Sequence, residues 1–200
     1  MKTALPALVL AALLFCPGHA PAADDETLWQ LLYEAFGNEE RVCAVLERID
    51  HELSLRPEDE GLLNMRISAY GSLHDPYSAK PDVYALARLH PDSPVHQLQK
   101  CMVDEATGME MEACRSCYLN VAALCERTGR TDGDDAGEYL MALLLAESPK
   151  AREVKQRFLA RLTDSPTDQL LREVMTHFSR DMAVGRVERR FVQHPCPAKK

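Results

Sequence analysis

The sequence has little of what β-sheets and common catalytic motifs are made from. It holds one tryptophan and 6% aromatic residues, and no stretch of five or more residues alternates clearly between apolar and polar side chains. It also has no phosphate-binding loop, no dinucleotide fingerprint, no G-x-S-x-G serine and no H-E-x-x-H pair. These absences argue against a strand-rich fold and against the enzyme classes that those motifs identify.

Positive charge and long apolar runs are also scarce. The chain has 23 Lys and Arg against 31 Asp and Glu, a net charge of −8, which argues against free nucleic acid as a partner. Its main apolar run, residues 5–15, follows Lys2 and is too short for a resident membrane helix. Small residues follow at positions 20, 22 and 23. Residues 1–23 are therefore predicted to be a cleaved signal peptide, and no transmembrane segment is expected. The periplasm is the expected location, with secretion as the alternative.

What the sequence does have is helical periodicity along most of its length. Leu28, Leu32 and Phe36 recur at helical spacing, and Gly37 follows them. Similar patterns, separated by short Pro- or Gly-containing turns, continue to about residue 185. We expect one all-α domain over residues 24–185, built from about eight to nine helices and stapled by disulfides, with a basic tail at 186–200. The helices are expected to form either an irregular bundle or a short repeat-like stack of helical hairpins.

One segment resembles a known repeat unit. Residues 133–162, GDDAGEYLMALLLAESPKAREVKQRFLARL, read as a helical hairpin with alanines at packing positions. This pattern is similar to the helix pairs of tetratricopeptide and Sel1-like solenoids. The resemblance covers these thirty residues, and the rest of the chain lacks the fixed period of those families.

The cysteines predict disulfides. With Cys16 in the signal peptide, an even number remains for an exported protein: Cys43, Cys101, Cys114, Cys117, Cys125 and Cys196. Cys114, Cys117 and Cys125 lie on one face of a single helix, because successive helical residues are rotated by about 100°. Cys125 is about 12 Å from Cys117 along the helix axis. We therefore expect three links from this helix to the rest of the chain. Counting outward from the turn favours Cys101–Cys114, which leaves Cys43 and Cys196 to share Cys117 and Cys125.

Two other roles for this C-x-x-C pair, Cys114 and Cys117, are considered. A redox pair usually opens a helix after a strand, where the helix dipole stabilises a thiolate, whereas here Glu110 and Glu112 precede it and oppose ionisation. A zinc site needs two further ligands, for which His96 is a candidate, and oxidation competes with it in an exported protein. No metal and no cofactor are expected.

Two polar segments are candidate contact surfaces. TDGDDAGE crowds Asp132, Asp134 and Asp135, but Leu143 falls where a calcium-binding EF-hand loop needs an acid. Helix capping is the simpler interpretation. LHDPYSAKPD, with His74, Asp75 and Tyr77, reads as a proline-rich loop that either connects helices or recognises a partner.

An acidic, disulfide-stapled helical body with a basic tail favours a protein partner with a positively charged site. This character resembles that of periplasmic immunity proteins, which neutralise effectors of contact-dependent or type VI secretion. The resemblance implies non-catalytic binding to a toxin or effector with a basic cleft. The alternatives are an envelope scaffold or assembly factor with tetratricopeptide-like helices, and a thiol-disulfide oxidoreductase that uses Cys114 and Cys117.

Overall fold

The computed structural model describes residues 23–133, 136–184 and Cys196. Within these residues it contains α-helices and no strand, as the sequence predicts. The helices are α2 (Ala23–Ala35), α3 (Glu39–Leu55), α4 (Glu60–Ser72), α5 (Pro76–Leu89), α6 (Pro94–Ala106), α7 (Met111–Thr128), α8 (Ala136–Leu145), α9 (Ala151–Arg161), α10 (Pro166–Thr176) and α11 (Arg180–Val184). In this part of the chain nine helices have ten or more residues, and α11 has five.

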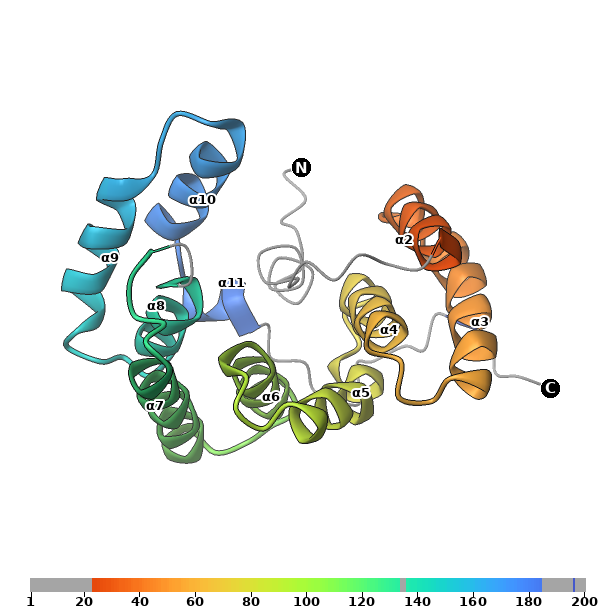
Figure 1. Ribbon diagram of the computed structural model, residues 1–200, viewed down its shortest axis with the longest axis horizontal. Helices are drawn as coiled ribbons and strands as arrows, with labels where there is room; N and C mark the ends of the chain where they lie inside the picture. Colours follow the sequence, from red (N-terminus) through yellow and green to blue (C-terminus); the bar gives the residue numbers. More distant parts are fainter. Residues whose placement is uncertain (1–22, 134–135, 185–195, 197–200) are drawn as a thin grey trace.

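The helices pack in chain order and form a curved arc (Figure 1). Each helix from α2 to α9 lies against the next, and the further contacts join α2 to α4, α6 to α8 and α6 to α11. Helices α2 and α3 form one end of the arc, and α9 and α10 form the other. Of the two expected arrangements, the repeat-like stack of hairpins describes this order better than a bundle around one core.

The apolar core has two clusters that meet at α6. One cluster is built from α2 to α5, with Leu32, Ile49 and Leu86 at its centre, and it includes Val103 of α6. The other is built from α6 to α11 and includes Leu98 and Leu140. Because successive residues of a helix point in different directions, α6 can contribute to both clusters and hold the two halves of the arc together.

Polar contacts also tie consecutive helices together. Arg66 of α4 donates two hydrogen bonds to Asp82 of α5, at 2.7 and 2.6 Å, and one of 2.8 Å to Asp50 of α3. These two carboxylates raise the pKa of the guanidinium despite its partial burial. One side chain therefore links three helices of the arc.

The segment LHDPYSAKPD differs from the prediction of a loop. Helix α5 begins at Pro76, inside this segment, and continues through Pro81. The Asp75 side chain accepts a hydrogen bond from the Ser78 amide, and Pro76 occupies the first helical turn, where a missing N–H costs nothing. Most of this segment, from Pro76 onward, is therefore helical.

The segment 133–162 forms a helical hairpin in the described residues, with α8 and α9 in contact. Its resemblance to tetratricopeptide and Sel1-like units stays a prediction. In the part of the chain that the structure describes, no helix combines the length and apolar character that a bilayer crossing requires. The predicted signal peptide, apart from Ala23, and the tail, apart from Cys196, lie outside the described residues.

Candidate functional site

The disulfide bonds differ from the predicted pairing. Cys101 of α6 is bonded to Cys117 of α7, with 5.8 Å between their Cα atoms, and Cys43 of α3 is bonded to Cys196, with 5.3 Å between theirs. The prediction of Cys101–Cys114 is therefore wrong by three residues along α7. Helix α7 makes one disulfide instead of three, and Cys114 and Cys125 are buried free thiols.

The C-x-x-C pair is consequently neither a dithiol nor a disulfide in this structure. Cys117 is bonded to Cys101, while the Cys114 thiol lies against the Met109 carbonyl oxygen at 3.4 Å. Burial raises the pKa of the other free thiol, Cys125, to about 11. Thiolate is the reactive form of cysteine, so burial keeps Cys125 in its unreactive state at neutral pH. Among the described residues no group of three or more potential metal ligands is assembled.

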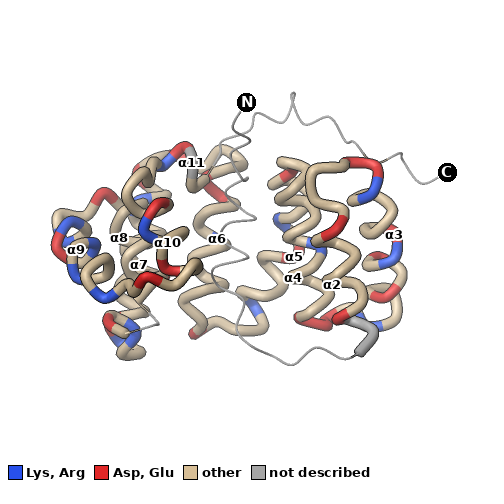
Figure 2. The backbone as a smooth tube through the Cα atoms, turned by 90° about the horizontal axis from the view of Figure 1, so that it is seen from above, with Lys and Arg blue, Asp and Glu red and all other residues tan. Residues whose placement is uncertain are grey.

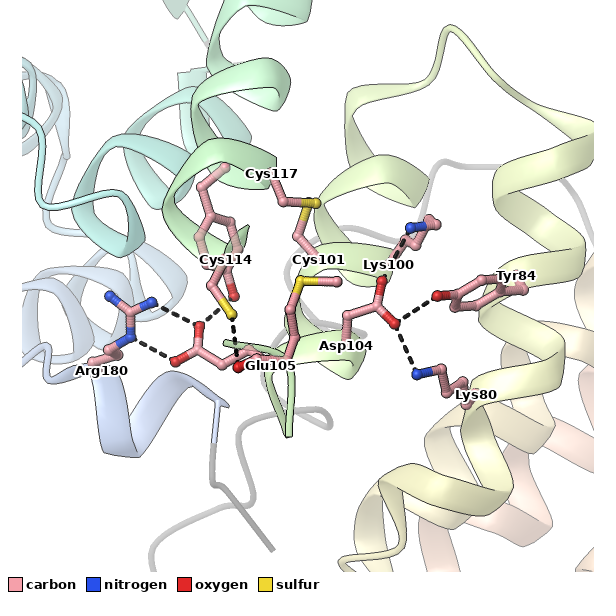
Figure 3. Close-up of a disulfide and its surroundings, with 11 residues drawn as sticks. Lys80, Tyr84, Lys100, Cys101, Asp104, Glu105, Cys114, Cys117 and Arg180 are labelled. Atoms are coloured by element: carbon pink, nitrogen blue, oxygen red, sulfur yellow. Dashed lines mark hydrogen bonds and ion pairs between the residues drawn. A yellow bond between two sulfur atoms is a disulfide. The ribbon is translucent and has the colours of Figure 1, made fainter. Parts of the chain in front are cut away.

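Next to the Cys101–Cys117 disulfide, α6 carries two buried carboxylates that point to opposite sides (Figure 3). Asp104 points towards α5, where it accepts a hydrogen bond of 2.6 Å from the Tyr84 hydroxyl and pairs with Lys80 at 2.9 Å. It also pairs with Lys100 at 3.0 Å. Burial alone would raise the pKa of Asp104, but the hydrogen bonds from Lys80, Tyr84 and Lys100 outweigh it and lower that pKa.

Glu105 points the other way, towards α7 and α11. Arg180 donates to both of its oxygens, at 2.6 and 2.9 Å, and the Tyr118 hydroxyl donates at 2.9 Å. Arg180 also donates to the Leu145 carbonyl at the end of α8, at 2.6 Å. Burial and the Glu105 carboxylate raise the pKa of Tyr118, so Tyr118 stays a neutral donor. Asp104 and Glu105 thus hold neighbouring helices in place, and their acceptor oxygens are occupied by protein donors.

Asp104 and Glu105 are only 2% and 1% exposed. The sequence contains a signal for Glu105, because it stands four residues after Cys101 and three after Met102, on the apolar face of α6. A carboxylate at such a position requires a buried cation or donor. The identity of that partner, Arg180, depends on tertiary structure.

The predicted contact residues are distributed over two separate turns. Asp132 is exposed, between α7 and α8, and pairs with Arg161 of α9. Asp134 and Asp135 lie outside the described residues. At the α4–α5 turn His74 is exposed with φ +54°, Asp75 is 2% exposed and caps α5, and Tyr77 is half-buried. The burial of Asp75 removes it from any contact surface.

A surface that was not predicted lies at the α2–α3 end of the arc. Tyr33 is 49% exposed, its ring stacks on Trp29 at 5.7 Å, and it meets Phe36 edge-on at 5.6 Å. Exposed glutamates come before and after Tyr33 in the sequence. None of their carboxylates has an ion-pair partner among the described residues. We call the following set the acidic α2–α3 surface: Glu26, Tyr33, Glu34, Glu39 and Glu40.

The backbone explains why these residues share one end of the molecule. At about 100° per residue, Glu26, Tyr33 and Glu34 fall on one face of α2. Asn38 caps α3 by accepting from the Arg41 amide, and the Arg41 side chain donates to the Glu34 carbonyl at 3.3 Å. The first turn of α3 is thereby held beside the end of α2. A groove of about 400 Å³ between these two helices is lined by Thr27, Leu28, Glu47, Arg48, His51, Glu52 and Arg56.

Comparison of the chain with protein-family models, with curated proteins and with solved structures finds no match. The function is therefore proposed from the chemistry of the described residues.

Proposed function

We propose that this chain is a non-catalytic protein-binding protein whose acidic α2–α3 surface binds a basic protein in fixed stoichiometry. The observation that carries this proposal is the exposed Tyr33, held between two aromatic neighbours and set among exposed carboxylates. Aromatic side chains dominate the energetics of many protein interfaces, and a polar rim around them is the usual arrangement. The rim here is mainly negative, since residues 23–40 contain six acids and no basic residue, and the neighbouring Arg41 donates to the Glu34 carbonyl.

The acids and the rigid fold have separate effects on binding. Carboxylates accelerate encounter with a basic surface and disfavour acidic competitors. The Cys43–Cys196 disulfide, the Arg66 ion pairs and the buried Glu105–Arg180 pair hold the arc in one shape. A surface that is ordered before binding loses less conformational entropy on association.

In a cellular setting, the partner is an effector or toxin with a basic cleft, and this protein is an exported immunity protein of the periplasm. A second candidate is an envelope scaffold, which the order of the helices favours, because stacks of helical hairpins present extended curved surfaces to partners. A thiol-disulfide oxidoreductase has less support, since Cys117 is bonded to Cys101 and Cys114 is fully buried.

The test begins with capture of partners from the native cell envelope on the immobilised wild-type protein. A captured protein is then purified and titrated calorimetrically at low and high salt. We expect saturation at a whole-number ratio and weaker binding at high salt.

Two matched variants each replace two glutamates with lysines, at different places on the molecule. Glu26→Lys/Glu34→Lys alters the acidic α2–α3 surface, whereas Glu110→Lys/Glu112→Lys alters exposed acids at the start of α7. The first variant is expected to lose binding and the second to keep it. Equal loss in both, or turnover of the captured protein without stable binding, would count against the proposal.

A further inference from the structure

The two ends of the arc carry opposite charge. Residues 23–40, at the α2–α3 end, have six acids and no Lys or Arg. Residues 150–161, which include α9 at the other end, have five Lys and Arg and one acid. Figures 1 and 2 both place α9 and the α2–α3 pair at opposite ends of the molecule. Within one molecule these charges are therefore far apart.

The basic residues lie on the exposed side of α9. Ala151, Val154 and Phe158 face the core of the stack, and the opposite side carries arginine. We call the exposed cationic residues of this segment the α9 basic face: Lys150, Arg152, Arg157 and Arg161. Arg152 has no ion-pair partner among the described residues, and Arg157 has only the loose, exposed contact with Glu153 at 3.7 Å. Lys150 and Arg161 pair with exposed carboxylates, those of Glu126 and Asp132.

An apolar side chain accompanies the charge at each end. Leu170 of α10, the helix that follows α9, is 54% exposed, and Tyr33 of α2 is 49% exposed. The last helix of a stacked array normally presents a polar outer face, because no further unit covers it. Here both terminal regions expose a large apolar side chain.

From this complementarity we infer that two copies of the chain associate head to tail, with the acidic α2–α3 surface of one copy against the α9 basic face of the other. Such a contact joins two different surfaces, so the pair keeps one free acidic surface and one free basic face, each able to bind a further copy. The contact also covers the surface that binds a basic protein in the proposed function. Self-association therefore competes with partner binding, although it does not depend on that function being correct.

The experiment measures the mass of the wild-type chain in solution by sedimentation velocity over a range of concentrations, at low and at high salt. We expect the average mass to rise with concentration at low salt and the rise to be suppressed at high salt, since exposed charges are screened. A wild-type chain that stays monomeric at every concentration would overturn the proposal.

A charge-swap pair identifies the surfaces. Glu26→Lys/Glu34→Lys makes both ends basic, and Arg152→Glu/Arg157→Glu makes both ends acidic, so each variant alone is expected to self-associate at least about tenfold more weakly. Mixing the two variants restores contact between an unaltered acidic end and an unaltered basic end, and a one-to-one complex is expected. Circular dichroism checks that each variant is folded.

Control variants reverse charge elsewhere. Glu110→Lys/Glu112→Lys and Arg88→Glu alter exposed residues away from both ends and are expected to associate like the wild type. If the mixed variants remain monomeric, or if the controls weaken association as much as the end variants, head-to-tail association is excluded. A wild-type chain that does not self-associate but still binds a captured basic protein would overturn this inference alone.

Discussion

The replacement Glu105→Gln removes one charge from a buried cluster that joins α6, α7 and α11. The carboxylate accepts three hydrogen bonds, two from Arg180 and one from Tyr118, and its side chain is 1% exposed. Glutamine offers one acceptor oxygen in place of two, and its NH₂ group is a donor that faces the donors of Arg180. The guanidinium would then remain half-desolvated, with only the longer contact to the exposed Glu147, at 3.4 Å, as a counter-charge.

Removal of one partner from a buried ion pair costs about 3–5 kcal/mol. The Arg180 side chain is 19% exposed, so water compensates in part and we expect a loss of about 3 kcal/mol from the free energy of unfolding. Urea denaturation under non-reducing conditions measures this, and a denaturant slope of about 2 kcal/mol per molar converts it to a midpoint shift of about 1.5 M.

The matched control is Glu112→Gln, because Glu112 is 87% exposed and a change there should stay within about 0.5 kcal/mol. In a double-mutant cycle, adding Arg180→Met to Glu105→Gln should recover part of the loss, since no buried charge is then left unpaired. A loss below about 1 kcal/mol for Glu105→Gln, or purely additive effects in the cycle, would refute the assignment of Glu105 and Arg180 as a stabilising buried pair.

Three further predictions follow from the cysteines and from one histidine. Native alkylation and peptide mapping should leave Cys114 and Cys125 unmodified until denaturant is added, and rapid native labelling of either would contradict their burial. Cys43→Ser/Cys196→Ser should lower the free energy of unfolding by up to about 5 kcal/mol in urea titrations, because this link closes most of the chain into a loop, and unchanged stability would contradict the bond. Burial lowers the pKa of His96, so the unfolded chain binds more protons than the folded one and stability should fall as the pH drops below about 6.5. His96→Gln should flatten this fall in urea midpoints measured at two pH values, and an unchanged slope would argue against His96 as its source.

The all-α fold could be predicted because apolar periodicity reports directly which side of a helix is buried. Leu28 and Leu32 of α2, and Val42 and Ile49 of α3, stand at the predicted spacing and are buried. The start of α5 was missed because DP before a polar segment reads as a turn, although the same two residues form a helix cap.

The disulfides show where sequence reasoning fails. Cys114 and Cys117 differ by less than one helical turn, about 4.5 Å along the axis, so which of them faces Cys101 depends on how α6 and α7 are rotated against each other. Counting residues from the turn cannot fix that rotation. Cys43 and Cys196 are 153 residues apart, and no local pattern reports a contact over that separation.

The acidic α2–α3 surface could not be recognised in the sequence for a similar reason. The three aspartates of TDGDDAGE stand close together in the sequence, and the one of them that the structure describes, Asp132, pairs with Arg161. The acidic α2–α3 surface combines residues from two helices around Tyr33. In the sequence these acids resemble the residues that commonly begin helices. Only the structure shows that aromatic side chains lie beside them.

The most direct test of stoichiometric binding through the acidic α2–α3 surface is site-specific photo-crosslinking in the native host. Benzoylphenylalanine replaces Tyr33 in one variant and Leu119 of α7 in the control, since these side chains are 49% and 48% exposed. We expect one defined protein adduct at position 33, lost when Glu26→Lys/Glu34→Lys is added, and absent at position 119. The absence of an adduct at position 33, or the same adduct at both positions, would contradict protein binding through this surface.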